Sequence, residues 1–270
     1  MGYFFAIIRN PVSFESIHLP MLKDLILTNK KVFFASDMHF GAPTVKESKE
    51  REANLVRWLN LIESEAEAIV LVGDIFDFWY EYKKVVPRGY IRLLGKLAEL
   101  SDQGIKIILF TGNHDLWMFN YLQEELNATV YTSPQVIEVN GMKILVGHGD
   151  GLGKGDYFYK LLKKVFTNRF CIWAFGRLHP NFGFRLAHAW SSKSRISDIT
   201  SFDKETDYLY NYCLELENKT HHDFYLFGHR HLPIKMELNE KSTYINIGEW
   251  IIDPHYGVLD NQGVELRKYV

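Results

Sequence analysis

The chain has 270 residues, of which 47% are apolar and 24% charged, and 31 basic against 33 acidic side chains give a formal charge of −2. This composition is that of a globular protein able to build a sizeable core. Its near-zero charge excludes a global attraction to nucleic acid or to an anionic membrane. Because Cys171 and Cys213 form no CxxC pair, we expect a reducing compartment and neither a thiolate zinc site nor a redox motif.

Residues 1–20 are predicted to be an N-terminal extension outside the fold, whose order the sequence leaves open. The apolar start MGYFFAII is too short to cross a bilayer and lacks the regions of a signal peptide. Ala6 breaks the myristoylation pattern that Gly2 begins. We therefore expect a cytoplasmic protein whose fold begins near Met21.

Short runs of β-branched or aromatic residues recur along the chain and predict buried strands. They occupy residues 31–36, 68–73, 106–111, 223–228 and 242–247. Helical spacing lies between them at Glu47–Glu63 and Tyr90–Ser101, and Asn140-Gly141 predicts a hairpin turn. Alternating strands and helices followed by a hairpin predict a layered α/β domain rather than an all-β or all-α one.

Residues 152–200 interrupt this alternation with a segment of helical spacing and Gly and Pro punctuation. The segment carries ten aromatic residues, and nine Lys or Arg against two acidic residues give it a local charge of about +7. One interpretation is a basic, solvated helix pair with an aromatic inner face. The other is a pocket for an anionic, partly apolar ligand.

Five predicted strands end in residues able to bind a metal ion. In chain order these residues are Asp37 and His39, Asp74 and Asp77, Asn113 with His114 and Asp115, His148, and finally His229 and His231. Because ligands of open α/β sheets bind beyond the carboxyl ends of the strands, we expect the five loops to converge on one edge. A glycine beside most of them, such as Gly73 or Gly112, lets the backbone approach bound ions closely.

The types of ligand indicate a transition metal. Imidazole nitrogen with carboxylate and amide oxygen suits Mn, Fe or Zn, whereas Ca prefers oxygen alone and structural Zn often takes sulfur. In the DxH and HxH pairs, residues i and i+2 of an extended segment project the same way, so both can face one site. A single histidine after a strand is usually a hydrogen-bonded polar residue. Five such clusters at strand ends are the stronger signal.

The motifs DxH, GDxxD, GNHD, HGD and GHxH, in this order from Asp37 to His231, resemble those of the calcineurin-like metallophosphoesterases. The resemblance implies a layered α-β-β-α sandwich with a core of residues 21–151 and 201–270. Residues 152–200 would form an inserted helical lid. This family hydrolyses phosphate esters with two metal ions.

The resemblance also implies the roles of the ligands. One ion would take Asp37, His39 and His231, the other Asn113, His148 and His229, and Asp74 would bridge the two. Such ions, roughly 3.5–4 Å apart, clamp a phosphoryl oxygen and hold a bridging hydroxide that attacks phosphorus in line. We expect two divalent transition metal ions, with Mn²⁺ first among the candidates.

The ligand Asn113 and three residues beside the ligands have implied roles in catalysis. His114, held by Asp115 and next to Asn113, would act as a general acid or as a donor to the phosphoryl group. Asp77 would accept a hydrogen bond from a ligand imidazole and so fix its tautomer. The other histidines, His18, His179, His188, His221, His222 and His255, are interpreted as structural or surface residues.

Within the superfamily the sequence is most similar to the UDP-2,3-diacylglucosamine diphosphatases of the lipid A pathway, which release UMP and 2,3-diacylglucosamine 1-phosphate. They too carry a helical lid between the HGD and GHxH motifs. Asp156 and Tyr159 stand where that family contacts the sugar, and Lys193, Ser194 and Arg195 resemble its phosphate-gripping stretch. A diacyl substrate implies peripheral association with an anionic membrane surface, on the inner face of the inner membrane.

Two alternatives stay open. Those lipid A enzymes carry Arg where this chain has His114, so a calcineurin-like hydrolase of another phosphodiester or of a soluble nucleotide pyrophosphate is the first rival. The second is a metal-free interaction module, which should have lost some of the ligand residues. The oligomeric state, the acyl length and the metal identity are left open by the sequence.

Overall fold

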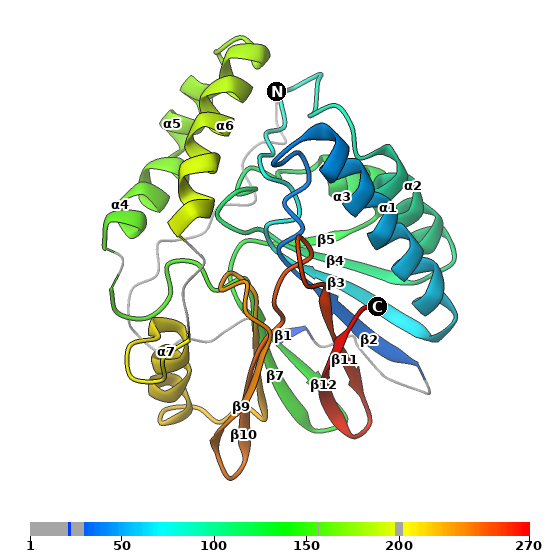
Figure 1. Ribbon diagram of the computed structural model, residues 1–270, viewed down its shortest axis with the longest axis vertical. Coiled ribbons are helices and arrows are strands. Elements are labelled where there is room, and N and C mark those ends of the chain that lie inside the picture. The colour runs from blue at the N-terminus through cyan, green and yellow to red at the C-terminus, as the bar shows by residue number, and fades with distance from the viewer. Residues whose placement is uncertain (1–20, 23–29, 156, 198–201) are drawn as a thin grey trace.

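The computed structural model describes residues 21–22, 30–155, 157–197 and 202–270, with only the backbone given for 21, 22 and 189–197. The expected extension, residues 1–20, lies outside this part of the chain. Two six-stranded sheets and the helices that cover them form the described structure (Figure 1).

The first sheet contains four parallel strands and an antiparallel edge. Its order is β12-β11-β2-β3-β4-β5, in which β2 (Lys31–Ala35), β3 (Ala66–Val72), β4 (Lys106–Phe110) and β5 (Thr129–Tyr131) are parallel. The edge hairpin consists of β11 (His255–Asp260) and β12 (Gly263–Lys268).

The second sheet is mixed, with the order β1-β6-β7-β8-β10-β9. Its strands are β1 (Met21–Leu22), β6 (Gln135–Val139), β7 (Met142–Gly147), β8 (Phe224–Phe227), β9 (Ile234–Asn239) and β10 (Ser242–Asn246). The predicted hairpin joins β6 to β7, and Asn140 and Gly141 adopt positive φ angles of 51° and 79°. These angles suit the type of turn that Asn-Gly favours.

Apolar residues on both faces of the strands form three buried clusters, one between the two sheets and one between each sheet and its helices. In β3, Ile69 and Leu71 face the helices while Val70 and Val72 face the second sheet, because successive side chains alternate across a strand. The outer helices of the first sheet are α1 (Val45–Ile62), α2 (Ile91–Asp102) and α3 (Tyr121–Leu126), and a short 3-10 helix (Glu63–Glu65) follows α1. Helix α7 (Tyr208–Glu217) covers the second sheet. The expected α-β-β-α sandwich is confirmed.

Residues 152–200, called the insert below, contain three helices that stand beside the sandwich (Figure 1). They are α4 (Tyr157–Phe166), α5 (Arg169–Phe175) and α6 (Pro180–Ser197). Their inner face packs on aromatic residues of the loops after β3 and β4. Trp117 donates from Nε1 to the carbonyl of Phe166 at 2.8 Å, and the Tyr80 hydroxyl donates to the carbonyl of Ile172 at 2.8 Å.

Aromatic rings fill the same contact. The Phe175 ring lies 4.7 Å from that of Trp117 and 5.0 Å from that of Tyr80, measured between ring centroids. Phe184 meets Phe78 edge-on at 5.0 Å, a geometry that aromatic pairs prefer. None of the helices in the described part of the chain has the length and apolar composition that crossing a bilayer requires.

Helix α2 receives its N-terminal cap from another helix. Its own N-cap residue, Tyr90, is left-handed with a φ of 59° and makes no side-chain cap bond. Buried Glu52 of α1 accepts instead from the N–H groups of Arg92 at 2.9 Å and Leu93 at 3.1 Å. A carboxylate near a helix N-terminus is stabilising because it meets unpaired N–H groups and the positive end of the dipole.

We expect Glu52→Ala to lower the free energy of unfolding by about 2 kcal/mol, since two buried N–H groups lose a charged acceptor. Urea unfolding followed by circular dichroism measures this change. Glu50→Ala is the matched control, because Glu50 is exposed on the same helix and should cost less than about 0.5 kcal/mol. Equal losses in the two variants would contradict the capping role.

Candidate metal centre

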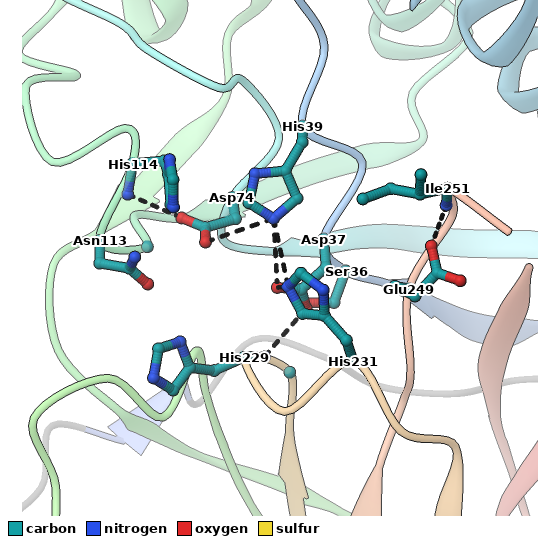
Figure 2. Close-up of polar contacts among 12 residues, drawn as sticks. Ser36, Asp37, His39, Asp74, Asn113, His114, His229, His231, Glu249 and Ile251 are labelled. Carbon is teal, nitrogen blue, oxygen red and sulfur yellow. Dashed lines mark hydrogen bonds and ion pairs between the residues drawn. The ribbon is translucent and has the colours of Figure 1, made fainter. Parts of the chain in front are cut away.

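The residues singled out by the sequence lie in five loops at the shared carboxyl edge of the two sheets (Figure 2). The loops after β2, β3 and β4 come from the first sheet, and those after β7 and β8 come from the second. The site therefore exists only when the sheets pack face to face. The expectation of one shared edge holds, although two sheets rather than one contribute to it.

The backbone of these loops is held in unusual conformations. Five non-glycine residues have positive φ: Asp37, His39, Asp74, His229 and His231. Such angles cost free energy and cluster at functional sites. Cross-loop hydrogen bonds support them, including His39 N to Asp74 O at 2.9 Å and Phe40 N to Ile75 O at 2.9 Å.

Glycines let these loops approach one another. A Cβ atom at Gly112 would lie 2.6 Å from the backbone N of Asp74, and one at Gly73 would lie 2.5 Å from Nδ1 of His148. Both distances are too short for real Cβ contacts. These two glycines are therefore required for the packing of the ligand loops.

Asp37, His39 and His231 direct their polar atoms to one point. His231 Nε2 lies 3.1 Å from Asp37 Oδ1 and 3.2 Å from His39 Nε2. Asp74 Oδ2 is 3.6 Å from the same His39 nitrogen. These contacts bring the carboxylate oxygens of two aspartates and the Nε2 atoms of two histidines together at one buried position.

A second cluster surrounds the other side of Asp74. Oδ2 of Asp74 lies 3.3 Å from His148 Nε2, which is 3.1 Å from the Asn113 side-chain oxygen. His229 completes a group in which the ligand atoms of Asp74, His148 and His229 all lie within 4.8 Å of one another. Asp74 thus stands between the two clusters.

Burial and neighbouring charges shift the pKa values of these groups strongly. Burial alone would raise the pKa of Asp37, but His231 and His148 lower it to about 2. The pKa of Asp74 is likewise well below its usual value, because His148 and His114 outweigh burial. Both carboxylates are therefore ionised at neutral pH.

Burial and the nearby carboxylates have opposite effects on the pKa values of the histidines. Burial lowers the pKa of His39 well below its ordinary value and that of His229 to about 4. Burial acts in the same direction on His148, but Asp74 and Asp37 raise its pKa well above normal. A cation bound to His148 would have to compete with a proton for the ring nitrogen, because metal binding requires the unprotonated imidazole.

The donor set fits divalent transition metal ions. Two imidazole Nε2 atoms 3.2 Å apart, His39 and His231, lie beside buried carboxylates, an arrangement that a cation between them would satisfy. Mixed imidazole, carboxylate and amide ligands match the preferences of Mn, Fe and Zn. Among the described residues, His39 and His231 with Asp37 form one group of candidate ligands, and His148 and His229 with Asp74 form another. His39, Asp77 and His114 form a third group close enough to hold an ion.

His114 and Asp115 are arranged differently from the expectation that Asp115 holds the His114 ring. Asp115 accepts from the backbone N–H groups of Ile75, Phe76 and Gly112. The His114 ring instead has Nδ1 3.2 Å from the Asp77 carbonyl and 3.8 Å from its carboxylate. Asp115 thus ties the loops after β3 and β4 together, because buried N–H groups need acceptors.

The residues expected to contact substrate are only partly described. Asp156 lies outside the described residues. Lys193, Ser194 and Arg195 belong to α6, but only their backbone is described. The Tyr159 hydroxyl donates a hydrogen bond to buried Asp150. Lys163 Nζ donates a second one to the same carboxylate at 2.6 Å. This cluster fixes α4 against the loop after β7.

Sequence reasoning missed two residues that reach the site. Arg51, buried in α1, donates from Nη2 to the carbonyls of His39 at 2.9 Å and Ala42 at 2.5 Å, and so holds the first ligand loop. His188 of α6 places Nδ1 3.2 Å from Oδ2 of Asp77. Its spacing of four residues from Phe184, a ring that packs inward, was the available signal.

The chain is similar to proteins that are already known. Residues 30–233 match the calcineurin-like phosphoesterase family. A UDP-2,3-diacylglucosamine hydrolase of Porphyromonas gingivalis is 36% identical over 255 residues, which are 88% of this chain and 97% of the relative. One of Pseudomonas fluorescens is 25% identical and covers 76% of this chain and 82% of its own. The solved Escherichia coli phosphoesterase Yfce aligns with 86% of this chain and 88% of its own, at 17% identity and a TM-score of 0.42.

The fold and the clustered ligands define a phosphoesterase that uses divalent metal ions. The chain belongs to the calcineurin-like phosphoesterase family, and it is a hydrolase.

Adding Mn²⁺ to metal-free protein is expected to raise the melting temperature by roughly 5–10 °C, because a ligand that binds only the folded state stabilises it. EDTA should reverse the rise. In Asp74→Asn the shift should be lost, since the carboxylate between the two clusters is removed. Differential scanning calorimetry measures the shift, and Asp102→Asn, at the exposed end of α2, is the control. A full shift in Asp74→Asn would contradict the assignment.

Proposed function

We propose that this protein hydrolyses the pyrophosphate of UDP-2,3-diacylglucosamine to UMP and 2,3-diacylglucosamine 1-phosphate. The observation that carries the proposal is the Porphyromonas gingivalis relative named for this activity, which aligns over 97% of its length. Because the alignment takes in 88% of this chain, part of the insert must fall within it. The likeness therefore extends beyond the metal-binding motifs.

In this proposal the two clusters bind two ions, with Mn²⁺ as the first candidate. Asp37, His39 and His231 would hold one, Asn113, His148 and His229 the other, and Asp74 would contact both. When bound, such ions activate water at neutral pH and neutralise charge on the phosphoryl group. The protein supplies the fixed geometry, because each ligand comes from a loop held by backbone hydrogen bonds.

His114 would serve the phosphoryl group or the leaving oxygen. Its Nδ1 lies 3.2 Å from the carbonyl of Asp77, and this acceptor fixes the proton of the ring on Nδ1. A proton on Nε2 as well then requires the imidazolium form. A donated hydrogen bond from this nitrogen would suit a phosphate anion. Asp77 would orient this ring and that of His39.

The insert would act as a lid over this site and bind the rest of the substrate. Its inner face is fixed on the loops after β3 and β4 through Tyr80 and Trp117. Asp156, Tyr159, Lys193, Ser194 and Arg195 are the proposed contacts with sugar and phosphate. Tyr159 already donates to Asp150, so it would meet a sugar hydroxyl as an acceptor.

Purified Mn²⁺-loaded protein is expected to release UMP and the lipid monophosphate from UDP-2,3-diacylglucosamine. It should prefer this substrate over a panel of soluble nucleotide pyrophosphates by orders of magnitude, measured as kcat/KM. His114→Ala should lower kcat roughly 10²- to 10⁴-fold, as removal of a proton donor does. His179→Ala, a histidine exposed at the start of α6, should leave it unchanged.

Turnover of the soluble compounds alone would favour the rival, a phosphoesterase for another phosphodiester or soluble pyrophosphate. That rival is supported by His114, which stands where the lipid A enzymes resembled by this sequence carry Arg. Absence of turnover on every compound with metal bound would contradict the enzymatic roles given to both clusters.

The outer face of the insert supports peripheral attachment to an anionic membrane, on the cytoplasmic side. Phe170 and Trp173 of α5 stack on one another, with 71% and 54% of their surfaces exposed. The insert also carries exposed basic residues, namely Lys164, Arg169, Arg177 and Arg185. The Arg177 guanidinium lies 5.0 Å from the centroid of the Trp173 ring. Aromatic rings favour the interfacial region, and cations attract anionic headgroups.

The double variant Phe170→Ser/Trp173→Ser is expected to bind anionic vesicles about tenfold or more weakly than the parent, because two apolar side chains no longer leave water. Vesicle sedimentation at low salt measures this binding, and added salt should weaken the binding of the parent protein. Leu61→Ser removes a similarly exposed residue, 69% exposed on α1, and should have no effect. Unchanged binding by the double variant would exclude this surface as the membrane contact.

A further inference from the structure

One side chain of the insert reaches the residues behind the metal centre. His188, in the middle of α6, has Nδ1 3.2 Å from Oδ2 of Asp77. The Asp77 side chain is 1% exposed, whereas that of His188 is 44% exposed. One turn earlier on α6, Phe184 packs edge-on against Phe78, the residue after Asp77. The hydrogen bond is therefore supported by an apolar contact between the same two segments.

The other oxygen of Asp77 faces two imidazoles of the site. Asp77 Oδ1 lies 3.8 Å from Nδ1 of His39 and 3.8 Å from Nδ1 of His114. His39 directs its other nitrogen, Nε2, toward Asp74 and His231. A single carboxylate thus stands between the insert and the ring of a candidate ligand.

The orientation of this carboxylate matters to a cation on the far side of His39. An imidazole that binds metal through Nε2 carries its proton on Nδ1, and a carboxylate facing this N–H favours the tautomer and the ring plane. A hydrogen bond to one oxygen restricts the rotation of a carboxylate about its Cβ–Cγ bond. With Oδ2 held by His188, Oδ1 faces the Nδ1 atoms of His39 and His114, each 3.8 Å away.

We infer that His188 is a positioning residue that acts through Asp77 on His39 and His114, and so couples docking of the insert to cation affinity at the metal centre. The inference rests on the proposed function only in that the clusters bind divalent cations. It requires no particular substrate. Because coupling is reciprocal, bound cation should also hold α6 more firmly against the loop after β3.

A double-mutant cycle on Mn²⁺ affinity, measured by isothermal titration calorimetry with metal-free full-length protein, tests the first half. Asp77→Asn should weaken Mn²⁺ binding roughly 10- to 100-fold, and His188→Ala roughly 2- to 30-fold. His188→Ala/Asp77→Asn should bind no more weakly than Asp77→Asn alone, because His188 acts through that carboxylate. Additive losses would overturn the inference, since they would show independent effects.

Two further variants separate the hydrogen bond from the packing of α6. His188→Asn keeps a side-chain N–H close to the position of Nδ1 and should restore Mn²⁺ affinity to within about twofold of the parent. His179→Ala, an exposed histidine beside the same helix, should bind like the parent. Failure of His188→Asn to restore any affinity, with its melting temperature unchanged, would overturn the inference.

Hydrogen exchange of the α6 backbone amides tests the reciprocal half. Adding Mn²⁺ should slow exchange across α6 in the parent but not in Asp77→Asn, and equal slowing in both would contradict the coupling. None of these measurements uses the lipid substrate, so the inference and the proposed function can fail separately. If the cycle behaves as expected but the protein does not cleave UDP-2,3-diacylglucosamine, only the proposed substrate is refuted. If the losses are additive in an active enzyme, only the inference is refuted. Absence of Mn²⁺ binding by the parent would overturn both.

Discussion

The arrangement of the whole carboxyl edge depends on the burial of two carboxylates, Asp37 and Asp74. Each uses one oxygen to hold a neighbouring loop: Asp37 Oδ2 accepts from the backbone N–H of His229, and Asp74 Oδ1 from that of His114. Each directs its other oxygen toward imidazoles. Removing such charges from water costs several kcal/mol per ion. The surrounding histidines offset part of this cost, and divalent cations held by the same side chains would offset more of it.

Other buried carboxylates extend the same device away from the ligands. Asp115 joins the loops after β3 and β4. Glu81 accepts from Trp79 Nε1 and from the backbone N–H groups of Phe119, Asn120 and Tyr121. These loops also carry the aromatic residues on which the insert packs. The ligand loops and the floor beneath the insert are therefore one hydrogen-bonded unit, so a change in the insert has a physical route to the metal centre.

Much of the fold could be predicted because its signals are local. The strands with continuous apolar runs, β2, β3 and β4, are buried on both faces, and such runs are the strongest pattern that a sequence offers. Strands β9 and β12 were not predicted. In β9 apolar and polar residues alternate, which is the pattern of a half-exposed strand, but the run is only six residues long. In β12 the pattern is absent and the end of the strand is exposed, so pairing with β11 decides its conformation. The sequence also did not show which strands belong to which sheet, because that depends on contacts between distant segments.

The sequence by itself determined the chemical identity of the site, since metal-capable residues follow buried strands and the carboxyl ends of strands converge. It also predicted helices in residues 152–200, where the strand-helix alternation stops, and α4, α5 and α6 lie there. Only the tertiary structure decided which partner each side chain takes. Tyr159 meets Asp150, Asp115 serves backbone N–H groups, and His188 reaches Asp77 across 111 positions. Contacts over such separations leave no periodic trace in the sequence, because they arise from the packing of whole elements rather than from the spacing of residues within one.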